Sequence, residues 1–497
     1  MTPLPLGLIP AHHAQRDPNR PLITQNDRVV TRAEFEARAN KRARALRNAG
    51  IAQNDFVMMF MPNGIEFFET SFALWKIGAT PVPLSVTMTE AELQANFDLI
   101  RPRAIIGSAF GPMAEVNLPA DLAIDEMLPA EALPACTPAY WRASMSGGST
   151  GRPKLILDHT PAVADPTQAM LGQSVDGVHL NSGPLYHSGP FGLAHRGLFA
   201  GSHLINMEKF DSGLLLNLIE QHKVDWVYLV PTMMHRIWQL PAEERNRYDL
   251  SSLRVAFHMA SVCPPWLKEN WINWLGPERI WELYSGAENP GRTVINGCEW
   301  LEHRGSVGRV QPGAKLMIYD DAGRESAPYE IGEVYFLTDG GKDAAFHYVG
   351  AEARLRGDWQ SLGDLGYLDN DGYLYIVDRR TDMIVSGGTN VYPAEIEAAL
   401  DSHPLVDSSV VIGLPDADLG HRVHAIVQLA PHAKDDLTDE HLRTHLRDRL
   451  VRYKIPKTFE FVEEPLRDHA GKVRRAALRE QRIKPAGQTA HLEPSTR

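Results

Sequence analysis

The stretch SGGSTGRPK, residues 146–154, decides which fold is expected of this chain of 497 residues. Glycines let a backbone turn tightly around a ligand, so that successive amides can converge on phosphate oxygens. Ser149 and Thr150 add hydroxyl donors, and Lys154 adds a mobile positive charge. The stretch lacks the Gly-Lys-Ser/Thr ending of the common GxxxxGK[ST] nucleotide loop. A flexible Gly/Ser surface loop is the plain alternative, but so specific a string favours a phosphate-binding loop.

Outward from this loop, the N-terminal three quarters of the chain alternate between helix and strand patterns. The helix patterns space apolar and charged residues at helical intervals and end on Gly, and the strand patterns are short apolar runs. Their alternation is typical of layered α and β structure. The alternation covers residues 31–50, 55–61, 64–78, 80–85, 201–210, 213–222 and 224–230. It predicts an α/β fold.

The chain changes character near Asp378, after a tight turn predicted at residues 369–372. Further helices are predicted at residues 393–400, 439–450 and 474–480, and further strands at 408–414, 423–429 and 459–462. We therefore expect three parts: an N-terminal domain (1–378), a hinge (379–381) and a small α+β C-terminal domain (382–497). The polar tail after Pro485 is expected to be frayed.

Composition excludes several classes of protein. The chain carries 50 basic and 62 acidic residues, a formal charge of −12, interspersed rather than in blocks, which disfavours nucleic-acid binding. The three cysteines, Cys136, Cys263 and Cys298, are odd in number and do not have the spacing of metal ligands. A disulfide framework is therefore not expected, and the reducing cytoplasm is the predicted compartment. The N-terminus does not resemble a signal peptide, and no apolar run approaches the ~20 residues of a membrane helix. A soluble cytoplasmic protein is expected.

The stretch at residues 146–154 resembles the signature Thr-Ser-Gly-Thr-Thr-Gly-x-Pro-Lys of the adenylate-forming superfamily. That superfamily contains acyl- and aryl-CoA ligases, firefly-type luciferases and peptide-synthetase adenylation domains. Five of the eight defined positions match; Gly147 stands for Ser, whereas Ser146 and Ser149 replace Thr and keep a hydroxyl. The resemblance implies a large N-terminal domain of βα layers with a small β-barrel-like part, followed by a small mobile α+β domain.

Further motifs of the family follow in its order along nearly the whole chain. PLYHSG at residues 184–189 resembles the segment that places a His at the acyl pocket, and YSGAE at 284–288 resembles Tyr-Gly-x-Thr-Glu. In that motif Tyr packs on adenine and Glu helps to hold magnesium. Residues 305–308 and 332–333 match two further landmarks, although a lone histidine such as His187 is more often structural.

Residues 362–379, LGDLGYLDNDGYLYIVDR, almost copy the family's ribose-binding stretch. A carboxylate can accept hydrogen bonds from both ribose hydroxyls, which gives Asp364 a physical role. Ile376 is expected against the base, and Arg379 near ribose and phosphate. A turn-capping role is the alternative for Asp364.

The last motif, AGKVRR at residues 470–475, places Lys472 in the position of the family's catalytic lysine. Attack of a carboxylate on the α-phosphorus of ATP concentrates negative charge, which a preorganised cation stabilises. A solvated lysine at a helix start is the alternative. VSGG at residues 385–388 resembles the loop that lines the coenzyme A channel.

The resemblance gives each candidate residue a role. The residues expected at ATP and AMP are Ser146, Gly147, Gly148, Ser149, Thr150, Gly151, Lys154, Ala260, Ser261, Tyr284, Ser285, Gly286, Ala287, Asp364, Ile376 and Arg379. The other expected roles are catalysis by Lys472, His187 and Glu288, Mg²⁺ binding by Glu288 and Thr150, a coenzyme A channel at Gly387 and Gly388, and a hinge at Thr381.

The chain departs from the family's pattern at four places. Ala287 replaces a Thr that donates to the α-phosphate, and Ser285 replaces a Gly. Ala260-Ser261 stands in place of Gly-Ala near adenine, and Thr381 stands where Asp or Lys is usual at the hinge. None of these changes removes an indispensable charge, although Thr381 leaves open an enzyme that transfers poorly to coenzyme A.

The resemblance implies an ATP-dependent acyl-CoA ligase, with Mg²⁺ as cofactor and ATP, CoA and a carboxylic acid as its small-molecule partners. Residues 184–191 lack the Asp that binds an amino acid in peptide synthetases, and Asp225 is interpreted as the start of a strand. The largely apolar segment 226–238 predicts an apolar acyl pocket. The stretches 231–235 and 266–274 resemble bacterial ligases of bulky acids, and this resemblance implies a bulky hydrophobic acid: steroid, terpenoid, fatty or aryl. A stand-alone enzyme that loads a carrier protein, or hands acyl-AMP to another enzyme, remains the alternative. A luciferase-like oxygenase, a non-catalytic relic and a homodimer also stay open.

Overall fold

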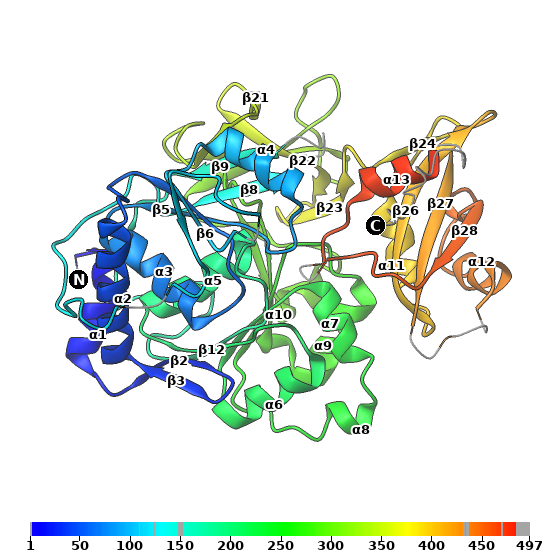
Figure 1. Cartoon of the computed structure of the whole chain (residues 1–497). Helices are drawn as coiled ribbons and strands as arrows, with labels where there is room; N and C mark the ends of the chain where they lie inside the picture. Colours follow the sequence, from blue (N-terminus) through cyan, green and yellow to red (C-terminus); the bar gives the residue numbers. More distant parts are fainter. Residues whose placement is uncertain are drawn as a thin grey trace, which may run out of the picture. The chain divides into compact units, whose positions relative to one another are not determined.

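The computed structural model describes residues 2–108, 110–122, 125–147, 153–430, 433, 437–468 and 471–483, without the side chains of residues 146 and 147. The chain forms two compact units (Figure 1). Unit 1 comprises Met1–Leu362, Gly366–Ile376 and His469–Gly471, and unit 2 comprises Gly363–Leu365, Val377–Asp468 and Lys472–Arg497. The domain and hinge boundaries expected from the sequence stay a prediction.

A nine-stranded sheet forms the centre of unit 1. Its strands, in spatial order, are β17 (Arg309–Val310), β16 (Thr293–Asn296), β15 (Ile280–Tyr284), β14 (Val255–His258), β13 (Trp226–Leu229), β11 (Val178–Asn181), β12 (His203–Asn206), β2 (Pro21–Gln25) and β3 (Arg28–Thr31). The six strands from β15 to β2 run parallel, while β3, β16 and β17 pair antiparallel at the edges. Parallel strands need crossover connections, which explains the alternation of helix and strand patterns.

In the described part of unit 1, ten α-helices surround the sheets. They are α1 (Ile9–Arg16), α2 (Arg32–Asn48), α3 (Ile65–Lys76), α4 (Glu90–Ile100), α5 (Ser188–Phe199), α6 (Ser212–His222), α7 (Pro231–Trp238), α8 (Ala242–Arg245), α9 (Pro265–Leu275) and α10 (Gly297–Glu302). Local sequence sets their starts: Thr31 and Glu34 form a capping box on α2, Asp211 caps α6, and Pro231 and Pro265 begin α7 and α9.

Unit 1 contains further sheets. A parallel sheet joins β5 (Thr80–Pro83), β4 (Phe56–Met59), β6 (Ala104–Ile106) and β7 (Val116–Leu118), and an antiparallel one joins β20 (Phe346–Val349), β9 (Pro153–Asp158) and β8 (Ala143–Gly147). Another sheet joins β18 (Ala314–Tyr319), β19 (Gly332–Thr338), β22 (Trp359–Leu368) and β21 (Arg354–Arg356), and β23 (Leu374–Arg379) also pairs with β22. A separate two-stranded sheet pairs β1 (Leu4–Pro5) with β10 (Val163–Ala164). Strands β22 and β23 continue into unit 2.

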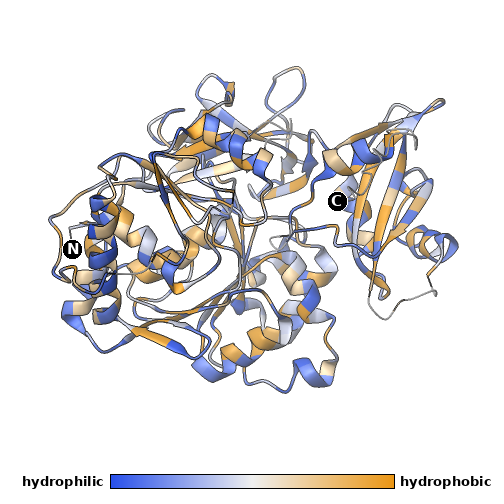
Figure 2. Cartoon of the chain, viewed as in Figure 1, coloured by the Kyte–Doolittle hydropathy of each residue, from blue (hydrophilic) through white to orange (hydrophobic). Residues whose placement is uncertain are grey.

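Unit 2 is a small α+β structure with its own core. Its elements are β24 (Ile384–Ser386), β25 (Thr389–Val391), α11 (Pro393–Leu400), β26 (Val406–Asp416), β27 (Gly420–Leu429), α12 (Asp439–Arg447), β28 (Thr458–Val462) and α13 (Arg475–Ile483). Strand β27 pairs antiparallel with β26 and parallel with β28. Hydrophobic residues, orange in Figure 2, run along β26 and β27, because apolar clusters cover both faces of this sheet.

The structure confirms the elements expected from the sequence to within a few residues. The helix predicted at 31–50 is α2, and the strand predicted at 55–61 is β4. The turn at 369–372 separates β22 from β23, with the Gly372 amide donating to the Asp369 carbonyl at 3.2 Å. Among the described residues, no helix combines the length and apolar character that a membrane crossing requires. The tail after Pro485 lies outside the described residues.

Candidate nucleotide-binding site

The glycine-rich stretch joins two antiparallel strands. Ser146 and Gly147 at the end of β8 pair with Lys154 and Pro153 of β9. Gly148, Ser149, Thr150 and Gly151, predicted to bind phosphate, lie outside the described residues. Because Lys154 belongs to β9, the strand fixes the direction of its side chain.

The side chains of Lys154 and Glu288 are in contact, although the two residues lie 134 positions apart in the sequence. Lys154 Nζ donates to Glu288 Oε1 at 3.1 Å, and the Tyr348 hydroxyl donates to the same oxygen at 2.6 Å. Burial alone would raise the pKa of Glu288, but Lys154 and the Tyr348 hydroxyl bring that pKa below its ordinary value. The carboxylate is therefore ionised at neutral pH.

This ionised carboxylate suits magnesium, a hard cation that prefers oxygen ligands. Glu288 lies in a turn that follows β15, and Gly286 gives the turn its room. A Cβ on Gly286 would lie 2.6 Å from Glu288 Oε2 and 2.9 Å from Leu362 Cδ2. A side chain at this position would therefore require the Glu288 carboxylate and the Leu362 side chain to shift.

Three of the departures from the family's pattern lie in this turn or just after β14. The Ser285 hydroxyl donates to the Gly291 carbonyl at 2.8 Å, which closes the turn that carries Glu288. Ala260 adopts φ +84°, a backbone conformation that suits the family's glycine better than alanine. A non-glycine residue held there costs on the order of 1–3 kcal/mol. Both Ala260 and Ser261 are exposed, whereas Tyr284 and Ala287 are half-buried.

His187 is the N-cap of α5, and its ring lies 4.4 Å from the ring of Tyr186. Gly189, in the first turn of α5, approaches two neighbouring strands. A Cβ on Gly189 would lie 3.4 Å from the Tyr228 hydroxyl and 3.6 Å from Met259 Sδ. The ends of β13 and β14 therefore meet the His187 segment, which sequence patterns alone did not indicate.

In unit 2, Asp364 lies within strand β22 and is 7% exposed. Its Oδ1 lies 3.4 Å from Arg379 Nε, and the Arg379 side chain is mostly exposed. Ile376 packs in unit 1 beside the apolar cluster of Val307, Val334 and Phe336.

The predicted hinge residue Thr381 follows Asp378, which anchors this segment. Asp378 accepts hydrogen bonds from the amides of Arg379 at 2.7 Å and Ala394 at 3.0 Å. Burial raises the pKa of Asp378 to about 6. The Thr381 hydroxyl lies 3.3 Å from Asp382 Oδ1.

Lys472, in unit 2, is exposed. Its amide donates to Asp468 Oδ1, and its carbonyl accepts from the Asp468 amide, both at 2.9 Å. Gly471 has φ +75°, which explains the glycine of the Gly-Lys pair.

Gly387 and Gly388 form the two-residue connection between β24 and β25, with φ values of +56° and +77°. A two-residue hairpin with both φ positive favours glycine. A Cβ on Gly388 would meet nothing within 4 Å. The hairpin turn therefore explains both glycines without a ligand, and their part in a coenzyme A channel stays a prediction.

Buried ion pairs connect the Lys472 segment to the rest of unit 2. Arg475, three residues after Lys472, lies 3.2 Å from Asp382 and also pairs with Glu397, a buried carboxylate of α11. Arg467 pairs with the same Glu397 at 3.3 Å. Burial would raise the pKa of Glu397, but both arginines lower it. Apart from the Gly-Lys-x-x-Arg spacing, no sequence pattern indicated these partners.

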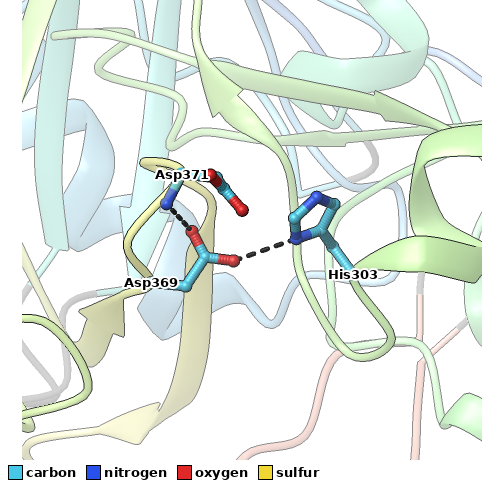
Figure 3. Close-up of side chains that lie close together, drawn as sticks. All are labelled: His303, Asp369 and Asp371. Atoms are coloured by element: carbon cyan, nitrogen blue, oxygen red, sulfur yellow. Dashed lines mark hydrogen bonds and ion pairs between the residues drawn. The ribbon is translucent and has the colours of Figure 1, made fainter.

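His303, Asp369 and Asp371 lie close enough together to suggest a metal site (Figure 3). Asp369 Oδ2, however, accepts from His303 Nδ1 at 3.0 Å and from the Tyr375 hydroxyl at 3.1 Å. Its Oδ1 accepts from the amides of Asp371 and Tyr373. Asp369 is thus satisfied by protein donors, and the cluster stabilises the turn between β22 and β23.

Comparison with known proteins places this geometry in a family. The model for the AMP-binding enzyme matches residues 10–340, and that for the AMP-binding enzyme C-terminal domain matches residues 395–472. Feruloyl-CoA synthase of an Amycolatopsis species is 30% identical, over 95% of this chain and 98% of that protein. The fatty acid–[acyl-carrier-protein] ligase ScoC of Streptomyces coeruleorubidus is 28% identical, over 94% of this chain and 95% of that protein.

Solved structures of related enzymes have the same fold as this chain. o-Succinylbenzoate CoA synthetase from Bacillus subtilis, in complex with its acyl-adenylate intermediate, superposes with a TM-score of 0.82 at 25% identity, over 96% of this chain and 98% of that one. A second structure of that enzyme, with ATP and a magnesium ion, gives a TM-score of 0.80 at 25% identity, over 95% and 98% of the two chains.

The chain belongs to the AMP-binding enzyme family, the adenylate-forming superfamily that the sequence motifs indicated. Within it, the protein is an enzyme of the AMP-forming acid–CoA ligase group. The predicted fold class is confirmed: a large α/β N-terminal domain and a small C-terminal domain.

Proposed function

We propose that this enzyme joins a bulky hydrophobic carboxylic acid to coenzyme A in two steps. The acid's carboxylate first attacks the α-phosphorus of ATP, which gives acyl-AMP and pyrophosphate. The coenzyme A thiolate then attacks the acyl carbon, which gives acyl-CoA and releases AMP. The observation that carries this proposal is the contact of Lys154 with the buried, ionised Glu288, because it brings the phosphate-loop lysine to the acid of a second motif.

Each charged residue has one task in the first step. Lys154 faces the phosphates as a cation, and Glu288 would hold Mg²⁺, which neutralises phosphate charge when bound. Asp364 accepts hydrogen bonds from the ribose hydroxyls. Lys472 enters with the small domain and stabilises charge at the α-phosphorus. Because only this step builds that charge, the lysine can leave before thioester formation.

His187 is proposed to receive the acid's carboxylate. Its position as N-cap supports this role, because the N-terminus of α5 favours negative charge. The approach of Tyr228 and Met259 to Gly189 supplies an aromatic and a flexible apolar surface nearby. Tyr228 is almost fully buried, so the acyl group would contact a rigid wall there. These features favour an aryl or other bulky apolar acid over an amino acid.

A carrier-protein thiol is the second candidate acceptor. One observation favours it: the Streptomyces coeruleorubidus relative, which matches over nearly the whole chain, is a fatty acid–[acyl-carrier-protein] ligase. The first step would be unchanged, and only the attacking thiol would differ.

A panel of fatty, aryl, steroid and diterpenoid acids tests the proposal through ATP-dependent pyrophosphate release. Active acids are then offered coenzyme A or a phosphopantetheinylated carrier protein, and the thioester is measured by mass spectrometry. Release with at least one class and conversion of coenzyme A support the proposal. Thioester on the carrier protein alone would favour the second candidate. No release with any class, together with no ATP binding, would refute adenylation.

A further inference from the structure

Tyr348 lies beside the Lys154–Glu288 contact although no motif contains it. In the antiparallel pair of β20 and β9, Tyr348 lies opposite Ile156, two residues from Lys154. Residues two apart on a strand share a face, and diagonal neighbours of this kind are within reach of long side chains. Lys154 Nζ accordingly lies 2.8 Å from the Tyr348 hydroxyl and 4.0 Å from its ring centroid.

The three side chains form a closed triangle in which each contacts the other two. The Tyr348 hydroxyl donates to Glu288 Oε1 at 2.6 Å and accepts from Lys154, which also donates to Oε1 at 3.1 Å.

We propose that Tyr348 is a positioning residue for magnesium-dependent nucleotide binding, an inference that rests on the adenylation function proposed above. Lys154 has two roles to fill: it neutralises Glu288 in the free enzyme, and it must face phosphate when the nucleotide is bound. Tyr348 gives Glu288 a donor that does not have to move. The carboxylate thus keeps its orientation when the lysine turns away.

The direction of the carboxylate supports this role. The contacts of Tyr348 and Lys154 both use Oε1, while Oε2 lies on the side of Gly286. Hydrogen-bond partners that orient a metal-binding carboxylate typically change metal affinity by about 10- to 100-fold when removed. Loss of the hydroxyl should therefore weaken metal binding without harming the nucleoside site.

Tyr348→Phe tests the inference because it removes only the hydroxyl. The ring keeps its edge-on packing against Phe346, at a centroid distance of 4.9 Å. Mn²⁺ is titrated into the enzyme with a non-hydrolysable ATP analogue and followed by electron paramagnetic resonance. AMP affinity is measured without metal by calorimetry. We expect a 10- to 100-fold weaker Mn²⁺ affinity and an AMP affinity within about twofold of wild type.

Tyr319→Phe is the matched control, since Tyr319 lies on β18 and packs edge-on against Tyr335 and Trp359. It should change neither affinity. If wild type binds the Mn²⁺–nucleotide complex and Tyr348→Phe binds it equally well, the positioning role is wrong and the proposed function stands. If wild type does not bind that complex, both proposals fail. Equal losses of Mn²⁺ and AMP affinity in Tyr348→Phe would indicate a packing role and overturn the inference.

Discussion

The ion pair of Lys268 and Glu282 offers the sharpest test of how the central sheet is built. Lys268, on α9, is fully buried, and its Nζ donates to Glu282 Oε2 on β15 at 2.5 Å. His258, paired with Glu282 across β14 and β15, has its Nε2 3.9 Å from the same oxygen. Burial, together with the charge of Lys268, lowers the pKa of His258 well below its ordinary value, so His258 is neutral beside this ion pair.

Lys268→Met should therefore destabilise the protein strongly at neutral pH. It leaves the Glu282 carboxylate, 4% exposed, without a cation, and breaking a buried pair in this way costs about 3–5 kcal/mol. At an unfolding entropy of ~2.1 cal/mol/K per residue, the free energy of unfolding of a unit of about 370 residues changes by roughly 0.8 kcal/mol per degree near Tm. The expected fall in Tm is then about 4–6 °C.

The pH dependence follows from the direction of the pKa shift. Burial already raises the pKa of Glu282 above 4.5, and the loss of Lys268 raises it further. A raised pKa in the folded state means that folding favours the protonated acid, so stability falls as pH rises above the unfolded value. The defect should shrink from pH 7.5 to pH 5.5, by up to about 2.7 kcal/mol at ~1.36 kcal/mol per unit.

Differential scanning calorimetry at both pH values measures these effects. Lys223→Met is the matched control, because Lys223 pairs with Asp249 at 2.9 Å with both side chains largely exposed, and its loss should cost less than about 1 kcal/mol. Adding Glu282→Gln to Lys268→Met should restore part of the stability at pH 7.5. A Lys268→Met variant as stable as the control, or equally destabilised at both pH values, would refute the reasoning.

Three predictions concern catalysis. Lys472→Ala should abolish acyl-adenylate formation yet largely spare thioester formation from supplied acyl-AMP, because only the first step needs a cation at the α-phosphorus. Asp364→Ala should weaken ATP binding about ten- to hundredfold in calorimetry, since ribose loses a charged acceptor. Thr381→Asp should speed coenzyme A transfer without changing adenylation in single-turnover kinetics, whereas Thr381→Pro, with φ held near roughly −65°, should slow transfer more than adenylation.

Each of these predictions has a distinct contrary result. Equal loss of both half-reactions in Lys472→Ala would mean that the lysine is not specific to adenylation. ATP affinity within about twofold of wild type in Asp364→Ala would leave Asp364 as a structural partner of Arg379. Coenzyme A transfer that already outpaces adenylation in wild type would show that Thr381 imposes no bias on the domain arrangement.

Local sequence was enough for most of the secondary structure. Apolar periodicity and the residues typical of helix ends located α2. Its capping box joins Thr31 and Glu34, which are only three residues apart in the sequence. Asp225 was interpreted as a strand start, and it does precede β13, where its carboxylate accepts from the Val178 amide at 3.2 Å. Such signals involve residues close together in the chain, so they can be recognised in the sequence alone.

The candidate site was only partly predictable. Motif spacing identified Lys154 and Glu288, but not Tyr348, because nothing in the order of the residues says that β20 pairs with β9. The same holds for Lys268 with Glu282 and for Arg475 with Glu397. A charged residue in a helix pattern looks solvated until the packed neighbours show that it is buried.

By itself, the sequence determined the family, the order of the elements and the chemistry of the motif residues, since glycine, lysine and carboxylate have properties that need no tertiary context. Only the tertiary structure decided which charges share a partner and which are desolvated. Glu288 and Glu282 are both buried acids near a lysine, yet the pKa of the first is lowered and that of the second is raised. Burial raises the pKa of both acids; at Glu288 the charge of Lys154 and the hydrogen bond from Tyr348 outweigh it, whereas at Glu282 the contact with Lys268 does not.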